Sequence, residues 1–127
     1  MDNMVSIWFG NFETENDLLE YTAESYTEDG EWVSSIFCKE FFEGDEPYEI
    51  DFFERYSVDE ATVDIHALLE GCSYDESVIK SLTTVVGDRL KKKYNSVILI
   101  FDFTVNDETK LIEGQVDYIA TVPYTKM

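Results

Sequence analysis

The first 56 residues mix acidic and aromatic side chains so closely that this mixture constrains how the chain can fold. Residues 1–54 contain sixteen Asp and Glu residues but one basic residue, Lys39, and thirteen of the nineteen aromatic residues lie in residues 1–56. Disordered acidic segments are poor in aromatic residues. We therefore expect this region to fold around its rings or to present some of them to a partner.

Charge is distributed unevenly along the chain. The sequence has 28 acidic and 9 basic residues, a formal net charge of −19, and the part after residue 54 contains twelve acids and eight bases. Such an imbalance costs stability through self-repulsion, disfavours nucleic acid and anionic membranes as partners, and favours a cationic surface. The acidic first part suggests a one-sided field; the alternative is that the acids only keep the protein soluble.

The length of the chain and its apolar segments indicate a small soluble protein. The 127 residues fit one domain, residues 1–127, with a core of ordinary size. The longest unbroken apolar stretch, residues 97–101, is too short to cross a bilayer. The amino terminus lacks the basic region of a secretory signal, so we expect a cytoplasmic protein. Cys38 and Cys72 match no disulfide framework or zinc spacing and are interpreted as small buried hydrophobic residues.

The amino-terminal patterns predict a strand followed by a helix. Residues 4–9 are rich in β-branched and aromatic residues, which is typical of a buried strand. Thr14 can cap a helix over residues 15–25, whose first-turn acids suit the positive end of the helix dipole.

The next segment predicts a turn and a second helix. Residues 27–30, Thr-Glu-Asp-Gly, form a turn signal, and either Ser34 or Ser35 can cap a helix that ends at Gly44. Residues 45–56 fit a short edge strand or an extended surface loop.

The second half predicts two helices and two strands. Apolar spacing favours a helix over residues 58–69 and another over residues 73–94, which places Lys91, Lys92 and Lys93 at its carboxyl end. Strands are expected over residues 96–105 and 113–122. The fold class is then α+β, with helices packed on one face of a small, mostly antiparallel sheet.

The sequence offers little support for catalysis or for a cofactor. A nucleophilic cysteine needs a nearby base, and the single histidine, His66, lies in an expected helix without an oxyanion signature. Carboxylate pairs carry no information among 28 acids, and the acids of residues 45–51 could contact calcium but lack the ligand order of an EF-hand. No glycine-rich phosphate loop is present. We therefore predict no enzyme, no metal site and no cofactor.

Recognition of a basic protein is the remaining function. Interface hot spots favour Trp and Tyr, and rings flanked by acids suit a partner rich in Lys and Arg. Trp32 follows an acidic turn and is the best candidate; the alternative is a core tryptophan. The predicted partner-binding residues are Glu28, Asp29, Glu31, Trp32, Asp45, Glu46, Tyr48 and Asp51.

Five blocks along the chain resemble the immunity protein 22 family, whose members accompany bacterial polymorphic toxins. They are Val-Ser-Ile-Trp-Phe-Gly-Asn-Phe at 5–12, Ser-Ile-Phe-Cys-Lys-Glu-Phe at 35–41, Leu-Leu-Glu-Gly-Cys-Ser-Tyr at 68–74, Asn-Ser-Val-Ile-Leu-Ile-Phe at 95–101 and Val-Pro-Tyr at 122–124. The chain differs from the family pattern at Cys72, where an aromatic residue is usual, and at residues 101–103, where a Tyr-Asn-Phe-like triplet is usual. These departures look like variation in the core.

The resemblance implies a non-catalytic protein that binds and neutralises a toxin domain in the cytoplasm. It implies no binding site at the level of residues, and the matched blocks are interpreted as framework that includes Trp8, Gly10, Phe37 and Tyr74. The charge is compatible with a nuclease toxin, whose phosphate-binding cleft the acids would occupy. An alternative is an acidic nucleic-acid mimic that regulates a basic DNA-binding protein. We expect no membrane or nucleic-acid partner, and a monomer is favoured.

Overall fold

The computed structural model describes residues 3–126 and contains a four-stranded sheet, a two-stranded hairpin and four α-helices within that range. In chain order the elements are β1 (Met4–Gly10), α1 (Glu15–Thr22), β2 (Ser25–Tyr26), β3 (Trp32–Val33), α2 (Ile36–Phe41), the 3-10 helix η1 (Ile50–Phe52), β4 (Phe53–Asp64), α3 (Ile65–Leu69), α4 (Asp75–Val86), β5 (Arg89–Phe101), the 3-10 helix η2 (Thr109–Leu111) and β6 (Val116–Pro123).

The main sheet has the strand order β4-β5-β1-β6, and all three pairings are antiparallel. β1 and the second half of β5 lie in the middle and are buried on both faces. This explains why residues 97–101 form an unbroken apolar run instead of alternating with polar residues. The antiparallel sheet and the α+β class are confirmed.

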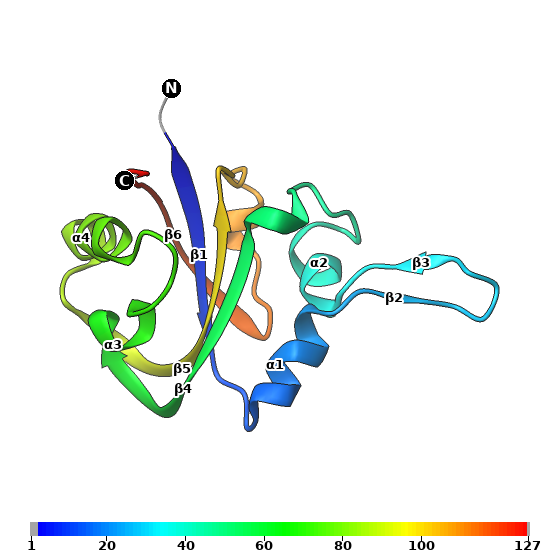
Figure 1. Cartoon of the computed structure of the whole chain (residues 1–127), viewed down its shortest axis with the longest axis horizontal. Coiled ribbons are helices and arrows are strands. Elements are labelled where there is room, and N and C mark those ends of the chain that lie inside the picture. The colour runs from blue at the N-terminus through cyan, green and yellow to red at the C-terminus, as the bar shows by residue number, and fades with distance from the viewer. Residues whose placement is uncertain (1–2, 127) are drawn as a thin grey trace.

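Two cores lie on opposite faces of this sheet. Val5, Ile7 and Phe9 of β1 point into one core, which α3 and α4 cover. Trp8 points into the other, which α1 and α2 cover. Figure 1 shows the two helix pairs on opposite sides of the sheet. The prediction that helices cover one face is therefore wrong, because a central strand that is apolar on both faces needs cover on both.

The core beneath α1 and α2 is built from aromatic rings. Trp8 is fully buried and makes edge contacts with Phe37 (5.1 Å between ring centroids), Phe41, Phe42 and Tyr118. Among the described residues, its indole N–H is the buried side-chain polar atom that lacks a hydrogen-bond partner. Most aromatic side chains of residues 1–56 therefore pack into the two cores. The acidic side chains between them lie outside these cores.

Both helix caps predicted in the first half are confirmed. The Thr14 hydroxyl accepts the Asp17 N–H at 3.1 Å, and the Ser35 hydroxyl accepts the Cys38 N–H at 3.0 Å. α1 ends at Thr22, earlier than predicted, because the chain leaves it to form the hairpin.

The helix predicted over residues 58–69 is wrong for most of its length. Strand β4 occupies this segment as far as Asp64, and only its last five residues form a helix, α3. The β-branched residues of this segment favour the strand, which pairs with β5 along an irregular register. Asp64 then caps α3 by accepting the His66 N–H at 2.9 Å.

The helix predicted over residues 73–94 ends at Val86 instead. Gly87 adopts a φ of +89° and closes α4 with its N–H bonded to the Thr83 carbonyl. Lys91, Lys92 and Lys93 consequently lie in β5, exposed on a strand that begins at Arg89. The glycine is a helix stop signal that the apolar spacing concealed.

Candidate partner-binding surface

The hairpin of β2 and β3 projects away from the two-core body (Figure 1). We call residues 24–33 the acidic arm, because this segment contains four acids and no base. Its turn is closed by two backbone bonds of 2.9 Å, from the Thr27 N–H to the Glu31 carbonyl and from the Gly30 N–H to the Thr27 carbonyl. Gly30 has a φ of +84°, so the turn predicted at residues 27–30 is confirmed.

Two aromatic rings are displayed on the acidic arm. Tyr26 and Trp32 lie opposite each other across the hairpin, and the two residues are 67% and 42% exposed. The Trp32 indole N–H donates to the Glu24 carboxylate at 2.9 Å, which orients the ring without burying it. Trp32 therefore lies outside both cores, and the alternative that it is a core tryptophan is wrong.

The predicted acids at the tip of the arm are all exposed. Glu28, Asp29 and Glu31 lie in and beside the turn, and their only polar contacts in the described structure are made by the backbone of Glu31. Their carboxylates are thus free to meet cations from a partner.

A second acidic segment, residues 43–52, follows α2, and we call it the acidic loop. It contains five acids and no base, and Asp45 and Asp51 are exposed. Ile50 and Phe52 of η1 are 59% and 39% exposed. The loop therefore repeats the combination of acids and exposed apolar groups that is found on the arm.

Tyr48 of the acidic loop also makes contacts with the aromatic core. Its ring stacks on Phe53 at 5.4 Å, and its hydroxyl lies 3.1 Å from the Cys38 sulfur. The side chain is half-buried, and these contacts fix the acidic loop to the aromatic core.

The root of the arm meets the acidic loop around a cavity of about 270 Å³. Glu24 and Arg55 line it together with Glu46 and Tyr48 of the loop. Partial burial and the neighbouring Glu24 carboxyl raise the pKa of the Glu46 carboxyl. The structure therefore brings Glu46 and Tyr48 next to the arm's root, whereas the predicted tip residues Glu28, Asp29 and Glu31 do not line this cavity.

Sequence reasoning missed Glu24 and Tyr26 on the acidic arm. An available signal was the pair of short β-prone segments on either side of a turn that ends in Asp-Gly-Glu, which is typical of a hairpin. Their opposition across the strands would have placed Tyr26 beside Trp32.

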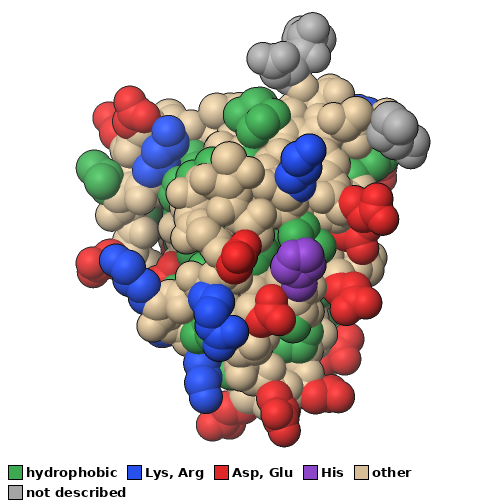
Figure 2. All heavy atoms as spheres, turned by 90° about the vertical axis from the view of Figure 1, so that its left-hand side faces the viewer, with side chains coloured by type: hydrophobic (Ala, Val, Ile, Leu, Met, Phe, Trp, Pro, Cys, Tyr) green, Lys and Arg blue, Asp and Glu red, His purple; other side chains and the backbone are tan. Residues whose placement is uncertain are grey.

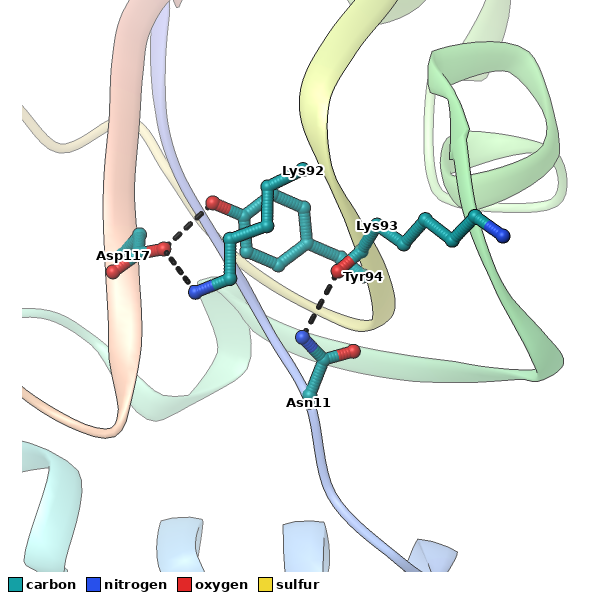
Figure 3. Close-up of polar contacts among 5 residues, drawn as sticks. All are labelled: Asn11, Lys92, Lys93, Tyr94 and Asp117. Atoms are coloured by element: carbon teal, nitrogen blue, oxygen red, sulfur yellow. Dashed lines mark hydrogen bonds and ion pairs between the residues drawn. The ribbon is translucent and has the colours of Figure 1, made fainter.

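The face covered by α3 and α4 has a different electrostatic character. Figure 2 shows Lys and Arg side chains lying among Asp and Glu on this side of the molecule. At the start of β5, Lys92 forms an ion pair of 3.4 Å with Asp117, which also accepts the Tyr94 hydroxyl at 2.6 Å (Figure 3). Asn11 donates to the Lys93 carbonyl beside it. Cations on this side are thus partly offset by local acids.

The residues considered for catalysis lie in different surroundings. Cys38 and Cys72 belong to the two different cores, and both are free thiols. Burial raises the pKa of both, that of Cys72 to about 12, which disfavours the thiolate that a nucleophile requires. His66 is exposed on α3.

Residues 3–126 contain neither a cluster of metal-ligating side chains nor a helix that could cross a membrane. Within that range no three His, Cys, Asp or Glu side chains gather so as to hold a metal ion. None of the helices described there has the length and apolar character needed to cross a membrane.

Comparison with known families decides the broad assignment. The sequence model of the family described as Immunity protein 22 matches residues 5–125. The chain belongs to this family. No curated protein and no solved structure matches it. Membership gives this immunity protein a toxin-neutralising role in general terms.

Most of the framework residues suggested by the family resemblance are buried or tightly packed in this immunity protein. Trp8 and Phe37 are fully buried, and a Cβ atom on Gly10 would lie 2.5 Å from the Val116 side chain. Tyr74 occupies the N-cap position of α4 with a φ of +56° and no side-chain capping bond, and its half-exposed ring packs on Tyr124 at 5.3 Å between ring centroids.

Proposed function

We propose that this immunity protein neutralises a cognate bacterial toxin that has a basic surface, and that it binds the toxin through the acidic arm and the acidic loop. The observation that carries the proposal is the projecting hairpin, which displays Tyr26 and Trp32 among four acids without a base. Exposed Trp and Tyr side chains are the residue types that most often dominate binding energy at interfaces.

The two parts of this surface would act on different steps of binding. Carboxylates attract a cationic partner over a distance of about one Debye length and raise the association rate, up to ~10⁸ M⁻¹s⁻¹ or more at low salt. The rings make short-range contacts that are lost only when the partner leaves, so they slow dissociation. Both effects favour tight, stoichiometric inhibition without catalysis.

The setting of the interaction follows from the same proposal. The protein acts as one domain in the cytoplasm, where the producing cell, or a neighbour that receives the toxin, needs protection. If the toxin is a nuclease of the polymorphic class, the acids at the arm's tip take the place of substrate phosphates in its active-site cleft.

The test compares charge-neutral variants on two faces of the molecule. The arm variant carries Glu28→Gln, Asp29→Asn and Glu31→Gln, and its matched control carries the same kinds of change at exposed acids of the opposite face, Glu70→Gln, Asp88→Asn and Glu76→Gln. Association with the toxin domain encoded beside this gene is measured by stopped flow at low and at moderate ionic strength.

We expect the arm variant to associate at least ~10-fold more slowly at low salt and to lose much of its salt dependence, while the control stays close to the wild type. Trp32→Ala should instead accelerate dissociation, with a loss of about 2 kcal/mol of binding free energy. Equal effects of the arm and control variants would show that the arm is not the binding surface.

A further inference from the structure

A second cavity, of about 590 Å³, opens on the other side of the acidic loop. It lies between α2 and the connection from β5 to β6, and Phe42, Phe103, Val105 and Ile112 form its apolar lining. We call it the α2 groove. Its volume falls within the usual range of preformed binding pockets.

The lining of the α2 groove is held rigidly by the aromatic core. Phe42 and Phe103 meet edge to face at 5.7 Å, and Phe42 also contacts the buried Trp8 ring at 6.2 Å. Val105 is 4% exposed. Because these side chains already pack against the core, the groove exists before any partner arrives.

The rim of the groove is acidic. Glu43, Asp45 and Glu108 lie among its lining residues, and no Lys or Arg occurs among the described residues that line it. The nearest base along the chain, Lys110, is paired with Asp107 at 3.4 Å. An apolar lining inside an anionic rim suits an apolar side chain that is flanked by cations.

The charge on the rim also argues against other occupants. A second copy of this chain would bring a formal charge of −19 of its own toward the same acids, and an anionic ligand would be repelled in the same way. The groove adjoins the proposed binding surface, because the acidic loop borders both cavities: Glu46 lines the first and Asp45 the second.

We infer that the α2 groove is a second docking site for the toxin and receives an apolar side chain flanked by Lys or Arg. This inference rests on the proposed function and adds a contact that the acidic arm does not provide. The toxin would then be held at two points, by the arm through charge and rings and by the groove through apolar burial.

The test fills the groove without touching the arm. Thr104 lines the groove with an exposed side chain, so Thr104→Trp places a large ring in it. Thr84→Trp on α4 is the matched control, since Thr84 is exposed on the opposite face. A second variant, Glu108→Arg, reverses one rim charge. Thermal unfolding checks that all three proteins are folded, and calorimetry measures their affinity for the toxin domain encoded beside this gene.

We expect Thr104→Trp to weaken binding by roughly 10- to 100-fold, the value of one large apolar side chain, by a similar factor at low and moderate salt. Glu108→Arg should weaken binding mainly at low salt, and Thr84→Trp should bind like the wild type. If Thr104→Trp binds with wild-type affinity while the arm variant loses binding, the inference about the groove is overturned and the proposed function stays intact. Absence of binding by the wild type would overturn both.

Discussion

Gly10 is the position at which a single added methyl group tests the sheet geometry most sharply. It is the last residue of β1 and lies opposite Ser96 of β5 and Val116 of β6. A Cβ atom built on Gly10 would lie 2.5 Å from Val116 Cγ1 and 3.2 Å from Val116 Cβ. Because carbon atoms do not approach each other so closely, either the valine or a strand must move.

The cost of Gly10→Ala follows from how little Val116 can move. This valine is 1% exposed and packs in the core beneath α1 and α2, so we assign the substitution an overpacking cost of about 1–3 kcal/mol. The alanine also reduces the entropy of the unfolded chain, which offsets about 0.4–1 kcal/mol. Overpacking prevails, and the net loss of unfolding free energy is about 1–2 kcal/mol, or roughly 3–10 °C in Tm.

Urea unfolding of Gly10→Ala, Val116→Ala and the double variant measures this clash directly. Val116→Ala removes the Cγ1 atom, so Gly10→Ala should cost little in that background. The double variant should therefore be at least ~1 kcal/mol more stable than the sum of the single effects predicts. Additive effects, or an unchanged stability of Gly10→Ala, would refute the proposed packing of β1 against β6.

Three further outcomes follow from buried polar groups and from charge. Tyr21→Phe should cost about 1.5–3 kcal/mol in urea unfolding, because the Tyr21 hydroxyl donates to the Glu40 carboxylate at 2.5 Å; an unchanged midpoint would contradict this. Burial raises the pKa of Cys72 from its ordinary value near 9 to about 12, so the stability that the protonated thiol contributes is fully present below pH 9 and is lost as pH rises toward 12. Cys72→Ala should therefore lose less stability than the wild type over that interval, and a parallel loss would exclude the thiol as its source. Finally, Tm should rise from low to moderate ionic strength as salt screens the net charge of −19; a flat Tm would mean that the acids barely repel one another.

Tyrosine hydroxyls take over part of the role that basic residues play in less acidic proteins. Three ion pairs occur among the described residues, and the lysine of each pair is exposed. Four tyrosines instead donate to carboxylates at 2.5–2.6 Å, in the pairs Tyr21–Glu40, Tyr56–Glu54, Tyr94–Asp117 and Tyr124–Asp102. Burial and these bonds raise the pKa of each of the four hydroxyls. The tyrosines of this chain therefore also supply hydrogen-bond donors to four of its carboxylates.

Local chemistry allowed the first half of the fold to be predicted well. Thr14 and Ser35 cap helices because a hydroxyl next to an unpaired backbone N–H is a short-range relation that sequence records. The turn at residues 27–30 is likewise encoded in four neighbouring residues.

In the second half, α4 begins close to the predicted residue and the two predicted strands overlap β5 and β6, but two segments were predicted wrongly because pairing between distant segments decides them. Residues 58–64 fit a helical spacing, yet the long strand β5 offers them hydrogen bonds and an apolar surface. The same competition places Lys91, Lys92 and Lys93 on a strand. The apolar spacing within a segment contains no information about a pairing strand that lies about 30 residues farther along the chain.

The candidate surface was predictable in composition and not in shape. The sequence indicated the acids and left Trp32 either exposed or in the core, and the structure shows that Trp32 is exposed on a hairpin, β2 and β3, that projects from the body of the molecule. The α2 groove could not be anticipated, because Phe42 and Val105 reach it from segments that only the folded sheet brings together.

Hydrogen–deuterium exchange locates the binding surface when the free protein is compared with its complex with the toxin domain encoded beside this gene. We expect backbone amides of the acidic arm, residues 24–33, and of the acidic loop, residues 43–52, to become protected in the complex. Amides of α3 and α4, on the opposite face of the sheet, should exchange as in the free protein. Protection confined to α3 and α4, with unchanged exchange in the arm, would contradict the proposed binding surface.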